Sequence, residues 1–258
     1  MKPSICIDAL FFGSDIPLLS QIEIVKKAGF STIEFWTWWD KDLDTLQGAC
    51  EEFQVDIHCI CTKFVSLVDF ACKQSYKEGL SETLKVAKQL SCPNIITQVG
   101  NRLDTLSELR QSRQAVDTLK EVADSVANAG CTLLVEPLNI RIDHSGYFLE
   151  TTDRAVSLIE QVDHPSVKLL FDIYHQQITE GDLLRHIEQS SHVIGHFHAA
   201  DNPGRDRPGT GEINYHFLLP QLDKLFNDSV LLGLEYFPKE DVSLSLSKMA
   251  SLLQGAHA

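Results

Sequence analysis

Short apolar segments alternate with longer amphipathic segments along almost the whole chain. The short segments are rich in β-branched and aromatic residues, which is typical of buried strands. The longer segments repeat their apolar positions at helical spacing. The predicted strands lie at residues 4–9, 31–36, 55–61, 94–100, 131–139, 167–175, 192–198 and 230–236. The predicted helices cover residues 17–28, 42–53, 75–90, 105–128, 152–162, 180–190, 213–226 and 241–253.

This alternation of strands and helices predicts a parallel sheet with helical crossovers. Eight strand–helix units follow one another, and no Pro-, Gly- or Ser-rich linker separates them. We therefore predict an α/β fold, a single (β/α)8 TIM barrel in which residues 1–258 form one domain. An open, doubly wound sheet is the alternative. That fold usually has a glycine-rich phosphate loop after its first strand, and the stretch from Asp8 to Gly13 offers none.

The charge of the chain limits what it can bind. Its 36 acidic and 22 basic residues give a formal net charge of −14. Nucleic acids and anionic membranes are bound mainly through Lys and Arg, so we expect neither as a partner. Asp8 interrupts the first apolar run, which argues against a signal peptide. The seven cysteines are odd in number and scattered, which fits free thiols in the cytoplasm.

Acidic or histidine side chains follow apolar runs near the ends of four consecutive predicted strands. They are Glu136, Asp172, His198 and Glu235. In a barrel the carboxyl ends of all strands face the side on which active sites lie. A single such residue is more often a helix cap or an ion-pair partner, but four in consecutive units favour a metal site. Three carboxylates and a neutral imidazole suit Mn²⁺, Mg²⁺, Co²⁺ or Zn²⁺, so we predict one divalent metal ion held by these four residues.

Further candidates for substrate binding lie close to the same strand ends. His175 could donate a hydrogen bond to a substrate hydroxyl or orient a metal ligand. Arg205 lies in the polar loop within residues 191–215 and could bind a carboxylate or phosphate. Lys63 follows the third strand, and His58 on that strand could contact substrate or pack in the core. A core role and a site role both stay open for His196, Trp36, Trp38 and Trp39.

Several motifs in the second half of the chain resemble a known family. EPLN, GYFL, FDIYH, GHFHAADNPGR, PGTGEINY and GLEY occur in this order. Together they resemble the hydroxypyruvate isomerase group of the xylose isomerase-like TIM barrels, and AGFSTIEFW fits the second strand of the family more loosely. ADNPGR with PGTGEINY is long enough to be specific. In this family a Glu, an Asp, a residue of strand seven and a second Glu hold the metal, which implies Glu136, Asp172, His198 and Glu235.

The resemblance implies a metal-dependent isomerase of the aldose–ketose type. It would interconvert a small 2-hydroxyaldehyde and a hydroxyketone through an enediolate, with Glu136 and Glu235 as acid and base. The substrate would be hydroxypyruvate, with tartronate semialdehyde as product, or a related 2-oxo acid. This chain departs from the pattern at His198, because hydroxypyruvate isomerases proper often carry Gln there and ketose 3-epimerases carry His. An epimerase of free ketoses is therefore the alternative.

Three other classes are less favoured. A lyase acting on inososes shares the barrel and the metal. A metal-dependent DNA endonuclease shares the barrel too, but the net charge of −14 argues against it. A binding protein without catalytic activity would have little use for a Glu on each side of a metal. We expect a small hydroxy-oxo acid or sugar as the substrate, and a homo-oligomer because the outer helices of barrels commonly pair.

Overall fold

The computed structural model describes residues 1–255, and eight parallel strands form a closed barrel in chain order. The (β/α)8 fold predicted from the alternating pattern is therefore confirmed. The strands are β1 Pro3–Cys6, β2 Thr32–Phe35, β3 Asp56–Cys61, β4 Asn94–Thr97, β5 Thr132–Val135, β6 Val167–Asp172, β7 Ile194–Ala199 and β8 Leu232–Leu234.

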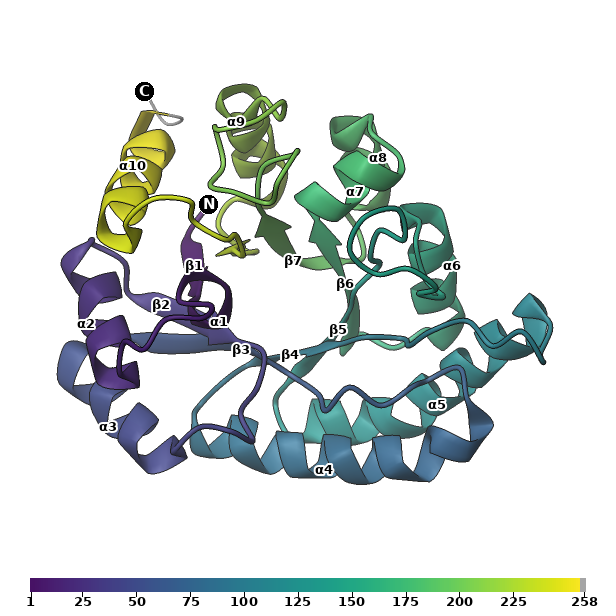
Figure 1. The fold of residues 1–258 in the computed structure, drawn as a ribbon. Coiled ribbons are helices and arrows are strands. Elements are labelled where there is room, and N and C mark those ends of the chain that lie inside the picture. Colours follow the sequence, from purple (N-terminus) through teal and green to yellow (C-terminus); the bar gives the residue numbers. More distant parts are fainter. Residues whose placement is uncertain (256–258) are drawn as a thin grey trace. The chain divides into compact units, whose positions relative to one another are not determined.

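Helices follow the strands along the chain (Figure 1). They are α1 Ile7–Leu10, α2 Leu18–Lys27, α3 Leu43–Phe53, the 3₁₀ turn η1 Phe70–Cys72, α4 Lys73–Gln89, α5 Glu108–Asn128, α6 Thr152–Val162, α7 Ile173–Thr179, α8 Leu183–Ser190, α9 Tyr215–Phe226 and α10 Val242–Gly255. Within residues 1–255, no helix combines the length and apolar character needed to cross a membrane.

Contacts between Cα atoms divide the described chain into two compact units, residues 1–58 with 197–255, and residues 59–196. In the first unit β1 pairs with β2 and β8, and β7 pairs with β8. In the second unit β4 pairs with β3 and β5, and β5 pairs with β6. The expectation of one domain over the whole chain stays a prediction.

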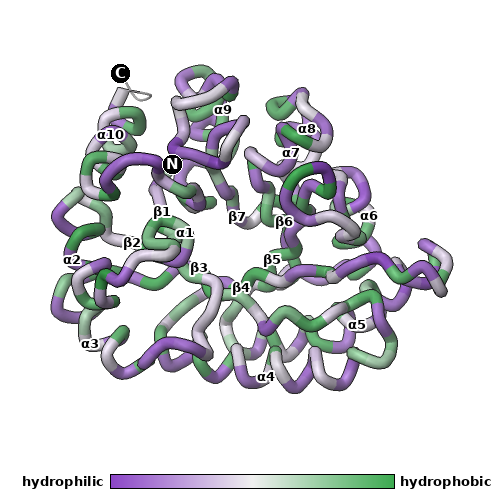
Figure 2. The backbone as a smooth tube through the Cα atoms, in the orientation of Figure 1, coloured by the Kyte–Doolittle hydropathy of each residue, from purple (hydrophilic) through white to green (hydrophobic). Residues whose placement is uncertain are grey.

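Local sequence signals explain where the helices begin and what they bury. The side chain of Asp42 accepts hydrogen bonds from the backbone N–H groups of Asp44 and Thr45 and caps α3. Ser107 caps α5 in the same way through the N–H of Arg110. α5 packs against α4 and α6 in the second unit, and α2 packs against α3 and α10 in the first. Figure 2 shows hydrophilic and hydrophobic residues alternating along α4 and α5, as expected for helices with one buried face.

Strand β5 shows that both faces of a strand in this barrel are covered. In β5 the side chains of Leu133, Leu134 and Val135 are all fully buried. Parallel strands that are covered on both faces read as continuous apolar runs rather than alternating ones. A polar residue at the end of such a strand is therefore buried too, as Glu136 is at 5% exposure.

Several strands end earlier than predicted: β4 ends at Thr97 instead of residue 100, and β5 ends at Val135 instead of residue 139. At β1 and β6 the structure shows the reason. β1 ends at Cys6, and Asp8 lies in the short helix α1, where its carboxylate accepts the N–H groups of Trp36 and Thr37. β6 ends at Asp172 instead of continuing to His175. The reason is that the Asp172 side chain accepts the N–H groups of Tyr174 and His175 and so starts α7.

Candidate functional site

In the first unit, polar side chains gather around Glu235, which directly follows β8. The Nε1–H of Trp36 donates a hydrogen bond to Glu235 Oε1 at 2.5 Å. The guanidinium of Arg205 is in contact with Glu235 Oε2, and Nδ1 of His198 lies 3.4 Å from the same oxygen. Both oxygens of a carboxylate that is only 5% exposed are therefore surrounded by polar groups.

These neighbours determine the charge of Glu235. Burial alone would raise the pKa of its carboxyl, but the Arg205 guanidinium, the His198 imidazole and the Trp36 N–H favour the ionised form. Together they outweigh burial and hold the pKa of Glu235 well below its usual range. The carboxylate is thus ionised at neutral pH.

A second buried carboxylate in this unit, Glu34 on β2, was not among the predicted site residues. Its Oε1 lies 3.0 Å from Nε2 of His198, and both side chains are only 2% exposed. The imidazole of His198 therefore lies between the carboxylates of Glu34 and Glu235. Burial, and after it the negative charges of Glu235, Glu34 and Asp8, raise the pKa of the neighbouring Cys6 thiol.

The buried carboxylate of Asp201 ties together distant parts of the loop after β7. Asp201 is fully buried, and it accepts backbone N–H groups from Asn202 at 2.9 Å, Gly209 at 2.7 Å and Ile213 at 3.1 Å. The predicted candidate Arg205 lies on this loop and reaches back to Glu235. The loop thus places a cation beside a strand-end carboxylate.

In the second unit, the predicted residues Glu136 and Asp172 lie close together. Glu136 directly follows β5 and Asp172 ends β6, and their exposed fractions are 5% and 1%. A carboxylate oxygen of each lies within 4.8 Å of one from the other. His175, on the first turn of α7, brings its Nε2 to 3.6 Å from Asp172 Oδ2. Buried acidic and histidine side chains therefore gather at the strand ends of each unit, which suggests a metal site.

The other candidates occupy different surroundings. Lys63 forms an ion pair with Glu82 at 2.5 Å, and both side chains are about half exposed at 40% and 51%. His58 is half-buried on β3, and His196 is fully buried on β7. The rings of Trp38 and Trp39 pack edge to face, with their centroids 5.6 Å apart. Substrate contacts by His58 and Lys63 stay predictions.

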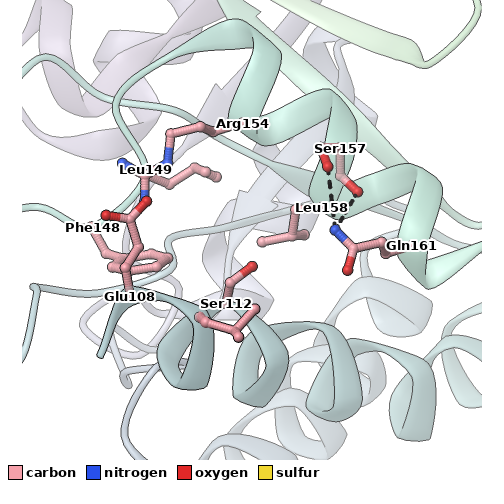
Figure 3. A pocket seen from close by; sticks show the side chains of 9 residues that line it. Glu108, Ser112, Phe148, Leu149, Arg154, Ser157, Leu158 and Gln161 are labelled. Atoms are coloured by element: carbon pink, nitrogen blue, oxygen red, sulfur yellow. Dashed lines mark hydrogen bonds and ion pairs between the residues drawn. The ribbon is translucent and has the colours of Figure 1, made fainter. Parts of the chain in front are cut away.

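A separate pocket of about 310 Å³ lies between α5 and α6 in the second unit (Figure 3). It contains none of the predicted site residues. Arg154 lies over the ring of Phe148 at 4.9 Å and pairs with Glu108 at 3.2 Å, while Gln161 donates to Ser157. Because these polar groups already bind one another, the pocket offers little chemistry of its own.

Comparison with known proteins identifies the family. The model of the xylose isomerase-like TIM barrel family matches residues 22–252. The chain belongs to this family. This xylose isomerase-like barrel is 30% identical over 256 residues to a putative hydroxypyruvate isomerase of Danio rerio, covering 93% of this chain and 92% of the relative. It is 29% identical over 250 residues to the hydroxypyruvate isomerase of Escherichia coli, covering 93% and 95%.

A solved structure agrees with the fold of this xylose isomerase-like barrel. The protein described as AP endonuclease, family 2, from Brucella melitensis superposes with a TM-score of 0.90 at 26% identity, covering 97% of this chain and 98% of that one. The named isomerase relatives confirm the resemblance drawn from the motifs. The protein is an enzyme of the isomerase class.

Proposed function

We propose that the protein is a metal-dependent isomerase that interconverts the 2-hydroxyaldehyde and hydroxyketone forms of a small 2-oxo acid, such as hydroxypyruvate and tartronate semialdehyde. The observation that carries this proposal is the set of buried carboxylates and imidazole at consecutive strand ends, β5 to β8. The relatives named hydroxypyruvate isomerase support the choice of substrate. Free ketoses are the second candidate, because His198 stands where ketose 3-epimerases of the family carry His.

In this proposal Glu136, Asp172, His198 and Glu235 hold one divalent cation. All four side chains are buried, and three carboxylates with one imidazole suit a hard or borderline cation. Buried carboxylates that lie this close to one another are the kind of charge that a cation would compensate. When bound, the cation would supply a positive charge that stabilises oxygen atoms of the substrate as they become negative.

The remaining steps fall to side chains of the chain itself. Glu136 and Glu235 would move the proton between the two carbon atoms, one as base and the other as acid. Arg205 would bind the carboxylate of the substrate, and His175 would donate a hydrogen bond to one of its oxygens. Trp36 donates its indole N–H to Glu235, and its apolar ring would keep water away from the reacting atoms.

An activity assay with a defined set of substrates tests the proposal. Purified protein, supplied in turn with Mn²⁺, Mg²⁺, Co²⁺ and Zn²⁺, is incubated with hydroxypyruvate, with a four-carbon 2-oxo acid and with free ketoses, and the products are identified by NMR. We expect turnover of a 2-oxo acid. Turnover of ketoses alone would replace the proposal by a 3-epimerase, and no turnover with any metal would refute both.

Arg205→Gln should separate anionic from neutral substrates. A charge-assisted hydrogen bond to a carboxylate contributes about 1.5–3 kcal/mol, so we expect KM for a 2-oxo acid to rise by at least about 10-fold. KM for a neutral ketose should change little. Arg185→Gln is the matched control, because Arg185 on α8 is 70% exposed and forms an ion pair with Asp182 at 3.2 Å, just before that helix. Equal changes in KM for both substrate types would contradict the assignment.

Glu34→Gln should weaken metal binding without removing a ligand. A carboxylate that accepts the second N–H of a metal-bound imidazole fixes its orientation, and losing it typically costs about 10- to 100-fold in metal affinity. Calorimetric titration of the metal-free variant with Mn²⁺ measures the affinity directly. Glu52→Gln, at an exposed position of α3, is the control. An unchanged affinity in Glu34→Gln would show that Glu34 does not act through His198.

A further inference from the structure

The side-chain amide of Asn139 has only one orientation that satisfies its surroundings. Its Oδ1 accepts the backbone N–H groups of Ile142 at 3.0 Å and Asp143 at 3.2 Å. Its Nδ2 lies 2.7 Å from the carboxylate oxygen Oδ2 of Asp143. Exchanging the two ends of the amide would place an N–H group against two N–H donors and an oxygen against a carboxylate. The hydrogen-bond partners of Asn139 therefore determine which end of its amide is Nδ2.

The same Nδ2 faces the imidazole of His175. The distance from Asn139 Nδ2 to His175 Nδ1 is 2.6 Å, and the backbone N–H of Asn139 approaches the same ring nitrogen at 3.4 Å. An amide NH₂ has two hydrogens and no acceptor, so one hydrogen points to Asp143 and the other to His175. Nδ1 of His175 must accept and cannot carry a proton. The neutral ring then carries its proton on Nε2.

We propose that Asn139 is a positioning residue that holds His175 as the Nε2–H tautomer. His175 is fully buried at the start of α7, and its Nε2 lies on the side of Asp172. Through Asn139, this position becomes a hydrogen-bond donor that does not depend on taking up a proton. The inference deepens the proposed function, on which its catalytic part rests, because a fixed donor suits a substrate oxygen that becomes negative during proton transfer.

The surrounding network explains how Asn139 is itself held. Asp143 accepts from the Tyr174 hydroxyl at 3.0 Å as well as from Asn139. Asn139 is fully buried, and the rings of His144 and Tyr174 pack against His175 with centroids 5.2 Å away. The imidazole therefore has little freedom to turn and present its other nitrogen.

Nitrogen NMR of the folded enzyme tests the tautomer. In protein labelled with ¹⁵N-histidine, correlation spectra between ring protons and ring nitrogens distinguish a protonated from an unprotonated nitrogen. The chain has 10 histidines, and the signals of His175 are assigned as those missing in His175→Gln. We expect an unprotonated Nδ1 and a protonated Nε2. The opposite pattern in the unmodified protein would overturn the inference.

A double variant reverses the polarity that faces His175. Asn139→Asp with Asp143→Asn exchanges carboxylate and amide, so the pair keeps its charge and its mutual hydrogen bond, but an acceptor now faces Nδ1. We expect the proton to move to Nδ1, and kcat and kcat/KM to fall together by about 10- to 100-fold, the usual loss when an orienting partner is removed. Asp143→Asn alone keeps the Asn139 donor and should keep the Nε2–H tautomer.

The outcomes separate the two proposals. If the double variant moves the proton but turns over substrate as fast as Asp143→Asn does, Asn139 sets the tautomer without serving catalysis and its positioning role is wrong. If the unmodified protein shows the Nε2–H tautomer but no isomerase activity, the proposed function fails while the tautomer assignment stands. Thermal unfolding of each variant verifies that the comparison is made between folded proteins.

Discussion

Glutamine in place of Glu136 or of Glu235 should abolish turnover and leave the fold intact. Glutamine has the shape of glutamate and keeps an oxygen that accepts hydrogen bonds, such as the one from Trp36 to Glu235. It cannot take up or release the proton that moves between the two carbon atoms of the substrate. Positioned acid–base groups contribute about 10²–10⁴-fold to rate, and loss of a metal ligand adds to that. We expect kcat to fall at least about 1,000-fold in each variant.

Proton exchange with solvent separates the two glutamates. In D₂O, a variant that still removes the substrate proton exchanges it for deuterium even when it forms no product. The variant that lacks the base should show neither exchange nor product, which identifies the base. Metal content is measured in both variants, and Glu160→Gln, at a half-exposed position on α6, is the control. If both variants kept near-normal activity, the acid–base assignment would be wrong.

Removing the divalent cation should inactivate the enzyme reversibly. In the proposal, the cation supplies the charge that stabilises the negative oxygens of the substrate. Dialysis against a chelator should lower kcat at least about 100-fold, and Mn²⁺, Mg²⁺, Co²⁺ or Zn²⁺ should restore it to different extents. The ligand set does not determine which metal is native. The native metal should be the one that restores most activity at its cellular concentration.

Stability gives a second measure of the same cation. A ligand that binds only the folded protein adds about 2.7 kcal/mol to the free energy of unfolding at 100 times its Kd. For a chain of this length, Tm should therefore rise by roughly 5–10 °C on metal addition. Asp172→Asn should abolish this rise. Full activity in protein whose metal content is below one-hundredth of an equivalent would disprove the metal requirement.

The strand-end residues could be predicted because, in this fold, a polar residue that follows an apolar run marks the end of a strand. Glu136, Asp172 and Glu235 interrupt continuous apolar runs, and a covered parallel strand shows such interruptions clearly. The structure places Glu136 and Asp172 together in one unit, and His198 beside Glu235 in the other. Asp172 also caps α7. The same aspartate is therefore both a helix cap, the usual role at a strand end, and a candidate site residue.

Glu34 and Asn139 could not be found in the same way. Glu34 alternates with Ile33 and Phe35 in β2, a pattern that resembles a strand with one solvent-exposed face, whereas in a closed barrel both faces are covered. The role of Asn139 depends on a contact with His175, 36 residues further along the chain. Neither spacing nor periodicity reports such a contact, because it depends on how the loop after β5 folds over α7.

The loop after β7 has a consequence for how this enzyme could be engineered. Asp201 holds the loop through three backbone N–H groups, and a Cβ atom at Gly211 would collide with the Asn202 carbonyl and lie 2.6 Å from Asp201 Oδ1. The conformation held by Asp201 therefore depends on glycine at position 211. Loops exchanged between relatives to alter selectivity should be transplanted with both residues, and the exposed positions between them are the ones to randomise in a library.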